Sequence, residues 1–323
     1  MIQTVTGAIT PEKVNRVLPH EHFTFGKPGC LYDMDNRYQR EAAYRNGVRN
    51  LQMAAKYDVN LIVDATTIEY GRDPAQLKQL SERMGCYIVC STGFFKDEGD
   101  MLALLRSISY QTDLVSWLER LFVREIETGI GDTGVKAGIL KTASSLGQIR
   151  PLERAVMEAA AHAQRKTGVP LLTHCDRGRL GLAQAELFRT WGVRPEQVVI
   201  GHMTSCRDLS EIMRIMDMGY RVGFDQFGIL SIPDIPDDEQ KKENLLALLR
   251  EGYEDSILLS HDCMFDRMGA VSSSKPRYPD LIFREVLPYL RGEGISEETI
   301  TKITRDNFLK LFHENRSTEG ENA

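Results

Sequence analysis

Short apolar segments alternate with longer amphipathic segments along most of the chain. Eight of the apolar segments are bounded by turn residues, as buried strands of a parallel sheet are: 17–23, 60–66, 87–93, 135–142, 169–174, 198–202, 221–227 and 257–262. Among the amphipathic segments, residues 152–167 follow Pro151 and end before Gly168, and 208–218 and 296–312 have a similar helical pattern. Strand and helix alternating eight times predict an α/β fold of the closed (β/α)8, or TIM, barrel type.

The remaining segments and the composition add few constraints. Residues 1–10 predict a short hairpin, and residues 315–323 a disordered polar tail. We see no linker, so we expect residues 1–323 to form a single domain. A net charge of -6 argues against a nucleic-acid partner, and the chain has no 18-residue apolar run and no signal-peptide pattern. We therefore expect a cytoplasmic protein without membrane contacts, in which the six cysteines are reduced, and a homodimer is plausible from the frequency of dimers.

Four histidines and an aspartate lie at or near the carboxyl ends of predicted strands. His20 and His22 end the first strand, and because residues two apart on a strand share a face, both imidazoles can point into the barrel mouth. His174, His202 and Asp262 end the fifth, sixth and eighth strands. Each of them alone fits a hydrogen-bonded structural residue. Together, imidazoles and a carboxylate at one rim form a ligand set that suits a divalent metal such as zinc.

Lys141 is the unusual polar residue, because it lies near the end of the fourth strand after three apolar positions. A buried lysine at this place has two uses: as a Schiff-base nucleophile, or as a free amine that reacts with carbon dioxide to give a carbamate. A carbamate offers two oxygen ligands that bridge two metals. Beside four histidines and an aspartate we favour the carbamate. Lys136, at the start of the same strand, lies at the wrong end.

The chain resembles the phosphotriesterase family of the amidohydrolase superfamily over nearly its whole length. The resemblance rests on the order and spacing of several short motifs: Thr-Val-Thr-Gly-Ala-Ile-Thr (4–10), Pro-His-Glu-His (19–22), Gly-Ile-Leu-Lys-Thr-Ala (138–143), Thr-Gly-Val-Pro-Leu-Leu-Thr-His (167–174), Ile-Gly-His-Met (200–203), Ser-His-Asp (260–262) and Thr-Arg-Asp-Asn-Phe (304–308). Each motif is weak alone, and the set is specific.

The resemblance implies a binuclear metal hydrolase, with two divalent ions that we expect to be Zn²⁺. It assigns His20, His22 and Asp262 to a buried metal and His174 and His202 to a more exposed one, with N-carboxylated Lys141 and a hydroxide bridging the two. The bridging hydroxide would attack a lactone carbonyl and open the ring, and Asp262 would act as the catalytic proton acceptor. His261 is expected to face away from the metals and support them.

The family includes enzymes for phosphotriesters, acyl-homoserine lactones and phosphorylated sugar lactones, so the loops must indicate the substrate. Lys242, Lys275, Arg277 and Tyr278 follow strands seven and eight and suit an anionic substrate group. Gln226 stands where we expect histidine in the triesterases and arginine in the acyl-lactone branch. We therefore predict a lactonase, a carboxylic ester hydrolase, for a phosphorylated sugar lactone, with Gln226 as another substrate contact.

Several alternatives stay open at this point. One alternative is that Lys241 and Lys242 begin a solvated helix face, and another is that Arg277 and Tyr278 belong to a loop that only packs over the barrel. Met264, Phe265 and Met268 would suit the tail of an acyl-homoserine lactone, and a phosphotriesterase is a further alternative. Outside the hydrolases, a Schiff-base lyase that uses unmodified Lys141, or a binding protein without activity, would also explain parts of the pattern.

Overall fold

The computed structural model describes residues 1–97, 101–229, 232–269 and 277–312. Lys275 and the predicted tail lie outside these residues. Eight parallel strands form one sheet in chain order: β3 (Val17–Glu21), β4 (Leu61–Asp64), β5 (Tyr87–Gly93), β6 (Ile139–Lys141), β7 (Leu171–Leu172), β8 (Val198–Ile200), β9 (Arg221–Phe224) and β10 (Ile257–Leu259). Each of the eight predicted strands is therefore confirmed, and each observed strand lies within its predicted segment.

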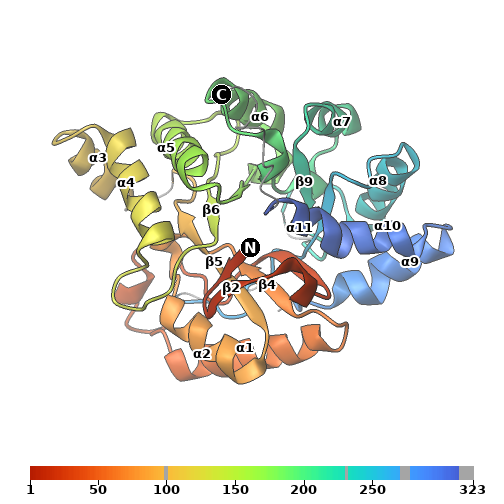
Figure 1. The fold of residues 1–323 in the computed structure, drawn as a ribbon, viewed down its shortest axis with the longest axis horizontal. Coiled ribbons are helices and arrows are strands. Elements are labelled where there is room, and N and C mark those ends of the chain that lie inside the picture. Colours follow the sequence, from red (N-terminus) through yellow and green to blue (C-terminus); the bar gives the residue numbers. More distant parts are fainter. Residues whose placement is uncertain (98–100, 230–231, 270–276, 313–323) are drawn as a thin grey trace, which may run out of the picture.

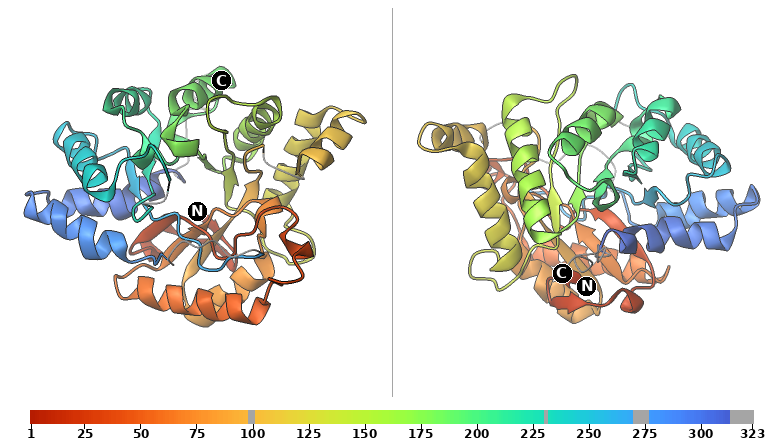
Figure 2. Two further views of the ribbon diagram at one scale, coloured as in Figure 1. Left: turned by 180° about the vertical axis from the view of Figure 1, so that it is seen from behind. Right: turned by 45° about the horizontal axis from the view of Figure 1, so that its top comes forward.

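Helices surround this sheet on the outside, as the three views show (Figures 1 and 2). They are α1 (Arg40–Ala55), α2 (Pro74–Met84), α3 (Met101–Ser109), α4 (Leu114–Glu127), α5 (Pro151–Thr167), α6 (Gly181–Thr190), α7 (Leu209–Asp217), α8 (Asp238–Arg250), α9 (Leu287–Gly292), α10 (Glu297–Thr301) and α11 (Asn307–Lys310). The predicted helix over 296–312 is helical from Glu297 to Lys310, with a π-helical turn between α10 and α11. No helix in the described part of the chain is long and apolar enough to cross a membrane.

Side chains alternate between two hydrophobic cores along the strands, as the two-residue period of a strand requires. Residues of one parity fill the barrel interior, including Val17, Leu61, Val63, Val89, Ile139, Leu172, Val199 and Leu258. Their neighbours pack outward under the helices, including Leu18, Ile62, Ile88, Leu140, Leu171, Val198, Val222 and Ile257. Strands covered on both faces explain why the segments are apolar throughout instead of alternating with polar residues.

The predicted N-terminal hairpin is confirmed as β1 (Ile2–Thr4) paired antiparallel with β2 (Gly7–Ile9). Ile2 and Ile9 join the interior core, together with Phe308 and Leu311 from the C-terminal helical segment. Val5 N donates to Ile88 O at 2.8 Å, which fixes the hairpin beside β5. These apolar side chains therefore fill the interior of the barrel away from the carboxyl ends of its strands. The polar side chains lie at the opposite rim, where the strands have their carboxyl ends.

The seam between β3 and the segment after β10 closes the barrel. His22 and Met264 form a parallel bridge, and Asp262 N donates to His20 O at 3.0 Å while His22 N donates to Cys263 O at 2.8 Å. These bonds lie beyond the regular part of β10, at the level of the predicted metal ligands. The hydrogen bonds that close the sheet therefore also hold the first and last strand-end ligands side by side.

Candidate metal centre

A β-bulge in β3 turns two of the candidate ligands into the barrel. β3 pairs with β4 from Val17 opposite Leu61 to Glu21 opposite Asp64, with one extra β3 residue between Leu18 and Glu21. An extra residue reverses which face the following side chains occupy. In a regular strand, His20 and His22 would lie on the face opposite to Val17. Because of the bulge, all three side chains point into the interior, and Glu21 points to the outer side.

The other ligands reach the same cavity from the ends of four more strands. Lys141 shares the inward parity of Ile139 on β6, and His174 follows β7. His202 and Asp262 have left-handed backbones, with φ of 62° and 52°. Histidine and aspartate tolerate this region better than most residues, and such conformations are common at functional sites. A cavity of about 850 Å³ is lined by five of the six candidates, His20, His22, Lys141, His174 and Asp262, and the buried ring of His202 lies just beneath.

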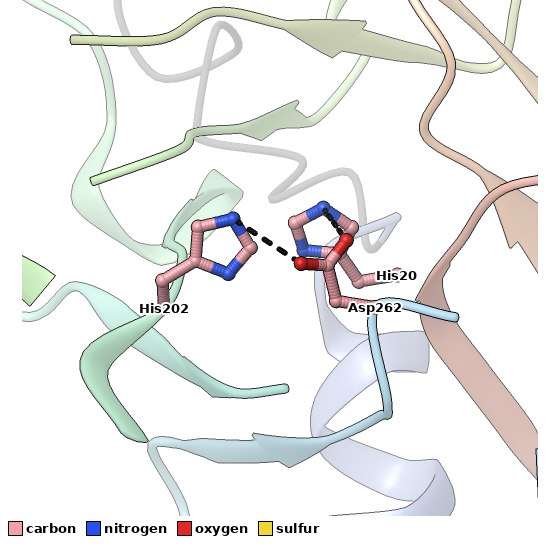
Figure 3. A group of neighbouring side chains, drawn as sticks. All are labelled: His20, His202 and Asp262. Atoms are coloured by element: carbon pink, nitrogen blue, oxygen red, sulfur yellow. Dashed lines mark ion pairs between the residues drawn. The ribbon is translucent and has the colours of Figure 1, made fainter. Parts of the chain in front are cut away.

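The six predicted side chains form one contact network. Lys141 Nζ lies 2.9 Å from His20 Nε2, and His22 Nε2 lies 3.2 Å from Asp262 Oδ1. The carboxylate of Asp262 also points toward His20 and His202, at 3.9 and 4.0 Å (Figure 3). His202 Nε2 lies 2.6 Å from His174 Nδ1. The donor atoms of His20, His202 and Asp262 all lie within 4.8 Å of one another, close enough to share one ion.

Hydrogen bonds behind the rings leave the inner nitrogens available as ligands. Asp225 accepts from His20 Nδ1 at 2.7 Å and from His202 Nδ1 at 2.8 Å, and Thr66 Oγ1 contacts His22 Nδ1 at 2.9 Å. A carboxylate can only accept, so the Nδ1 atoms of His20 and His202 carry the proton and their Nε2 lone pairs face the cluster. A carboxylate behind a histidine is typical of metal sites.

Burial sets the protonation of the cluster in a way that also suits a metal. Desolvation, together with the nearby Lys141, lowers the pKa of His20 to about 3, and desolvation lowers that of His174 well below its usual value. Burial lowers the pKa of Lys141 to about 8, so that part of the amine is free near neutral pH. Burial opposes ionisation of Asp262, but His202, His22 and His20 outweigh it and hold the pKa of Asp262 well below its usual value. Neutral imidazoles, an ionised carboxylate and a reactive amine fit a divalent metal centre.

The predicted substrate contacts divide into three groups. Gln226, Arg277 and Tyr278 line the cavity. Lys242 does not, because its ammonium group lies outside it, 2.7 Å from Glu239 and over the ring of Tyr289. Lys275 falls outside the described residues. Gln226 donates from Nε2 to Asp262 Oδ2 at 3.0 Å, so that it contacts a candidate ligand as well as the cavity.

Two charged residues that support the site were not recognised from the sequence. Glu21 is fully buried and accepts four hydrogen bonds from residues 260, 261 and 263, including His261 Nδ1 at 3.0 Å, which keeps His261 turned away from the cavity. Lys241 is also fully buried and donates to Gln226 O, Ile229 O and Asp238 Oδ1. A charged residue between two inward-facing histidines was a signal for Glu21. Lys241 gave none, because Lys242 beside it looks the same in sequence.

Comparisons with known proteins show the family of the chain. A sequence model of the phosphotriesterase family matches residues 1–312. An aryldialkylphosphatase of Saccharolobus solfataricus is 30% identical over 94% of this chain and 97% of its own length, and an N-acetyltaurine hydrolase of Rattus norvegicus is 27% identical over 95% and 96%. The crystal structure of a mutant PTE-like lactonase from Deinococcus radiodurans superposes with a TM-score of 0.93 at 34% identity, covering 97% of this chain and all of that one. The chain belongs to the phosphotriesterase family and is a metal-dependent hydrolase.

Proposed function

We propose that the protein is a lactonase that uses two divalent metal ions, with zinc as the expected metal, and that its preferred substrate is a phosphorylated sugar lactone. The observation that carries the proposal is the contact network of six candidate ligands, from five strand ends, beside a cavity that five of them line. His20, His22 and Asp262 would hold one ion and His174 and His202 the other. Lys141, as a carbamate, would bridge them.

The metal ions, when bound, lower the pKa of water and polarise the ester carbonyl. The residues of the chain then decide how the proton moves and where the substrate lies. Ionised Asp262 is the group that accepts the proton from the attacking water and returns it to the ring oxygen as the C–O bond breaks. Gln226 fixes Asp262 through Oδ2, and Ser205 Oγ donates to Gln226 Oε1 at 2.6 Å, which orients the amide so that its NH2 faces the carboxylate.

The cavity walls support a small, polar and anionic substrate. Arg267, Arg277 and Tyr278 are among the residues that line the cavity, and their N–H and O–H groups suit a phosphate. Phe95, Phe227 and Ile229 provide an apolar surface for a ring. The lining also contains the pair Lys96–Asp176, at 2.6 Å, which suits sugar hydroxyl groups. Because these apolar residues also suit an acyl chain, an acyl-homoserine lactone is the second candidate substrate class.

A matched set of substrates tests this proposal. Metal-loaded protein is assayed with a sugar lactone and its phosphorylated form, and with an acyl-homoserine lactone and a phosphotriester. We expect the largest kcat/KM for the phosphorylated lactone and loss of this activity in Asp262→Asn. Equal rates for the two sugar lactones would contradict recognition of the phosphate. Faster hydrolysis of the acyl lactone or the triester would show that this compound, and not a sugar lactone, represents the preferred substrate class.

The Schiff-base alternative is separated by a trapping experiment. Borohydride added with a carbonyl substrate reduces an imine to a stable amine, so a lyase would gain the mass of the substrate at Lys141. We expect no adduct at Lys141. An adduct at this residue would contradict the carbamate and, with it, the binuclear site.

A further inference from the structure

Asp262 has a backbone conformation that must be held in place by its surroundings. Its φ of 52° lies in the left-handed region, which costs a non-glycine residue free energy, although less for aspartate than for most. Its side chain is at the same time the candidate ligand and proton acceptor. A small rotation of the peptide groups on either side of Asp262 would move the carboxylate away from His20 and His22.

Glu21 holds these peptide groups from the side of β3. Its Oε1 accepts from His261 N at 3.0 Å, and its Oε2 accepts from Cys263 N at 2.7 Å, so one buried carboxylate binds the N–H groups on both sides of Asp262. The N–H of Asp262 itself donates to His20 O at 3.0 Å. All three N–H groups of this turn therefore bind β3, on which His20 and His22 lie.

Arg277 holds the carbonyl groups of the same turn from the cavity side. Its Nη1 donates to His261 O at 2.6 Å, and its Nη2 donates to Asp262 O. The guanidinium group is planar and presents five N–H donors in a fixed arrangement, so it can bind two acceptors and still offer donors to a third. Arg277 also lines the cavity, where a substrate would bind.

We propose that Arg277 is a positioning residue for Asp262 and that it couples recognition of the substrate's anionic group to the placement of this carboxylate. The proposal rests on the proposed function in one respect, the anionic substrate. The same guanidinium group binds the two carbonyl oxygens and the anion, so that a bound anion holds Arg277 in the orientation that fixes the Asp262 turn. The phosphate of the substrate therefore contributes to kcat as well as to binding.

Arg277→Lys tests the proposal, with Arg284→Lys as the matched control. Lysine keeps the positive charge but has a single nitrogen. Unlike the planar guanidinium group, it cannot bind both carbonyl oxygens and an anion at the same time. Arg284 lines the same cavity and pairs with Asp280 at 3.1 Å, and no described hydrogen bond joins it to the Asp262 turn. For the phosphorylated lactone we expect kcat to fall about 10- to 100-fold in Arg277→Lys, a range typical of residues that orient a metal ligand. We expect KM to change less than kcat, and Arg284→Lys to keep the wild-type kcat.

Metal retention gives a second readout that needs no substrate. Because a misplaced Asp262 holds its metal less well, Arg277→Lys should lose metal to a chelator faster than the wild type, and Arg284→Lys should not. In Arg277→Ala, added guanidinium ion should slow the loss of metal again, because it can occupy the place of the missing side chain. A folding defect would not be corrected in this way. A raised KM with unchanged kcat and unchanged metal loss would reduce Arg277 to a binding residue and overturn the proposal. If the wild type shows no preference for the phosphorylated lactone, the proposed substrate fails, while the chelator experiment still decides whether Arg277 positions Asp262.

Discussion

A single carboxylate, Asp225, connects the two groups of proposed metal ligands. Its Oδ2 binds His20 and its Oδ1 binds His202, and the backbone N–H of His202 donates to Oδ1 at 3.0 Å. Neighbouring His202 and His20 outweigh the cost of burial and keep the pKa of Asp225 well below its usual value. Asp225 therefore stays ionised and fixes one ring of each proposed site together with the left-handed backbone of His202.

Asp225→Asn should weaken the binding of both metal ions. Asparagine has one acceptor oxygen, so it can serve only one of the two imidazoles, and its NH2 group would face the other N–H. We expect a fall in metal affinity of about 10- to 100-fold, measured by competition with a coloured chelator. Asp280→Asn removes a carboxylate that lines the cavity but has no described contact to these rings, and it serves as the control. Unchanged affinity in Asp225→Asn would show that the rings hold their orientation without it.

Lys141 should carry a carbamate when the protein is loaded with metal. Its pKa of about 8 leaves a larger fraction of reactive amine at neutral pH than an exposed lysine has. We expect a carbamate signal in the ¹³C NMR spectrum of protein loaded with ¹³C-bicarbonate and metal. Lys141→Met should remove this signal. It should also lower the activity by more than the about 10- to 100-fold that is typical of a residue that only orients a metal ligand. Lys136→Met, at the other end of the strand segment, should keep both; a carbamate signal that survives in Lys141→Met would contradict the assignment.

At the scale of the elements, the sequence predicts the position of a strand better than it predicts irregularities of the backbone at the strand's end. An apolar run between turn residues is visible in the sequence, and so all eight strands were found. The bulge in β3 was not, because it depends on pairing between β3 and β4. The expectation that His20 and His22 share a face was sound, since it uses only the two-residue period. That this is the interior face follows from the bulge.

The segment after β4 contains a buried carboxyl group, Glu69, that should make stability depend on pH. Glu69 accepts from Phe95 N at 2.7 Å, and the ring of Phe95 packs against His174, 4.6 Å between centroids. Burial raises the pKa of Glu69 from 4.5 to about 7. The folded protein keeps the proton between these two values while the unfolded chain loses it, so this contribution to stability is complete below about pH 4.5 and lost as the pH rises through 7.

Glu69→Gln should remove this pH dependence. The shift of pKa corresponds to about 3 kcal/mol of stability lost between pH 4.5 and 8, and glutamine keeps the acceptor for Phe95 N while it does not ionise. Urea unfolding of the metal-free proteins at pH 5 and pH 8 measures the effect. We expect the free energy of unfolding to fall less with pH in Glu69→Gln than in the wild type. Glu186→Gln, at an exposed position, should behave like the wild type, and an equal fall in all three proteins would locate the dependence elsewhere.

At the scale of the whole molecule, the meeting of the six candidate side chains could be predicted because the barrel brings all carboxyl strand ends to one rim. The roles of Arg277 and Lys241 could not. Both are basic residues in or after loops, where the sequence suggests solvent or substrate, yet Arg277 binds two backbone carbonyls and Lys241 is buried among three oxygens. All their partners but the Asp238 carboxylate are backbone groups of loops whose paths the sequence does not specify. Residue types therefore predicted which side chains meet at the rim, whereas long-range contacts to the backbone decide which residues hold them there.

Removal of the metal should destabilise the whole barrel as well as stop the reaction. The proposed ligands come from β3, β6, β7, β8 and β10, and His20 and Asp262 lie on the two sides of the seam that closes the sheet. An ion that binds only the folded protein at 100 times its Kd stabilises it by about 2.7 kcal/mol. For a chain of 323 residues, whose unfolding entropy is about 2.1 cal/mol/K per residue, that corresponds to a fall in Tm of roughly 4 °C on removal. Calorimetry before and after chelation, and again after zinc is restored, measures the change. The variant His174→Ala/His202→Ala, which keeps the ligands at the seam, should retain part of the difference, because a metal held by His20, His22 and Asp262 still joins the first strand to the last. An equal Tm with and without metal would mean that the rim is held by its hydrogen bonds alone.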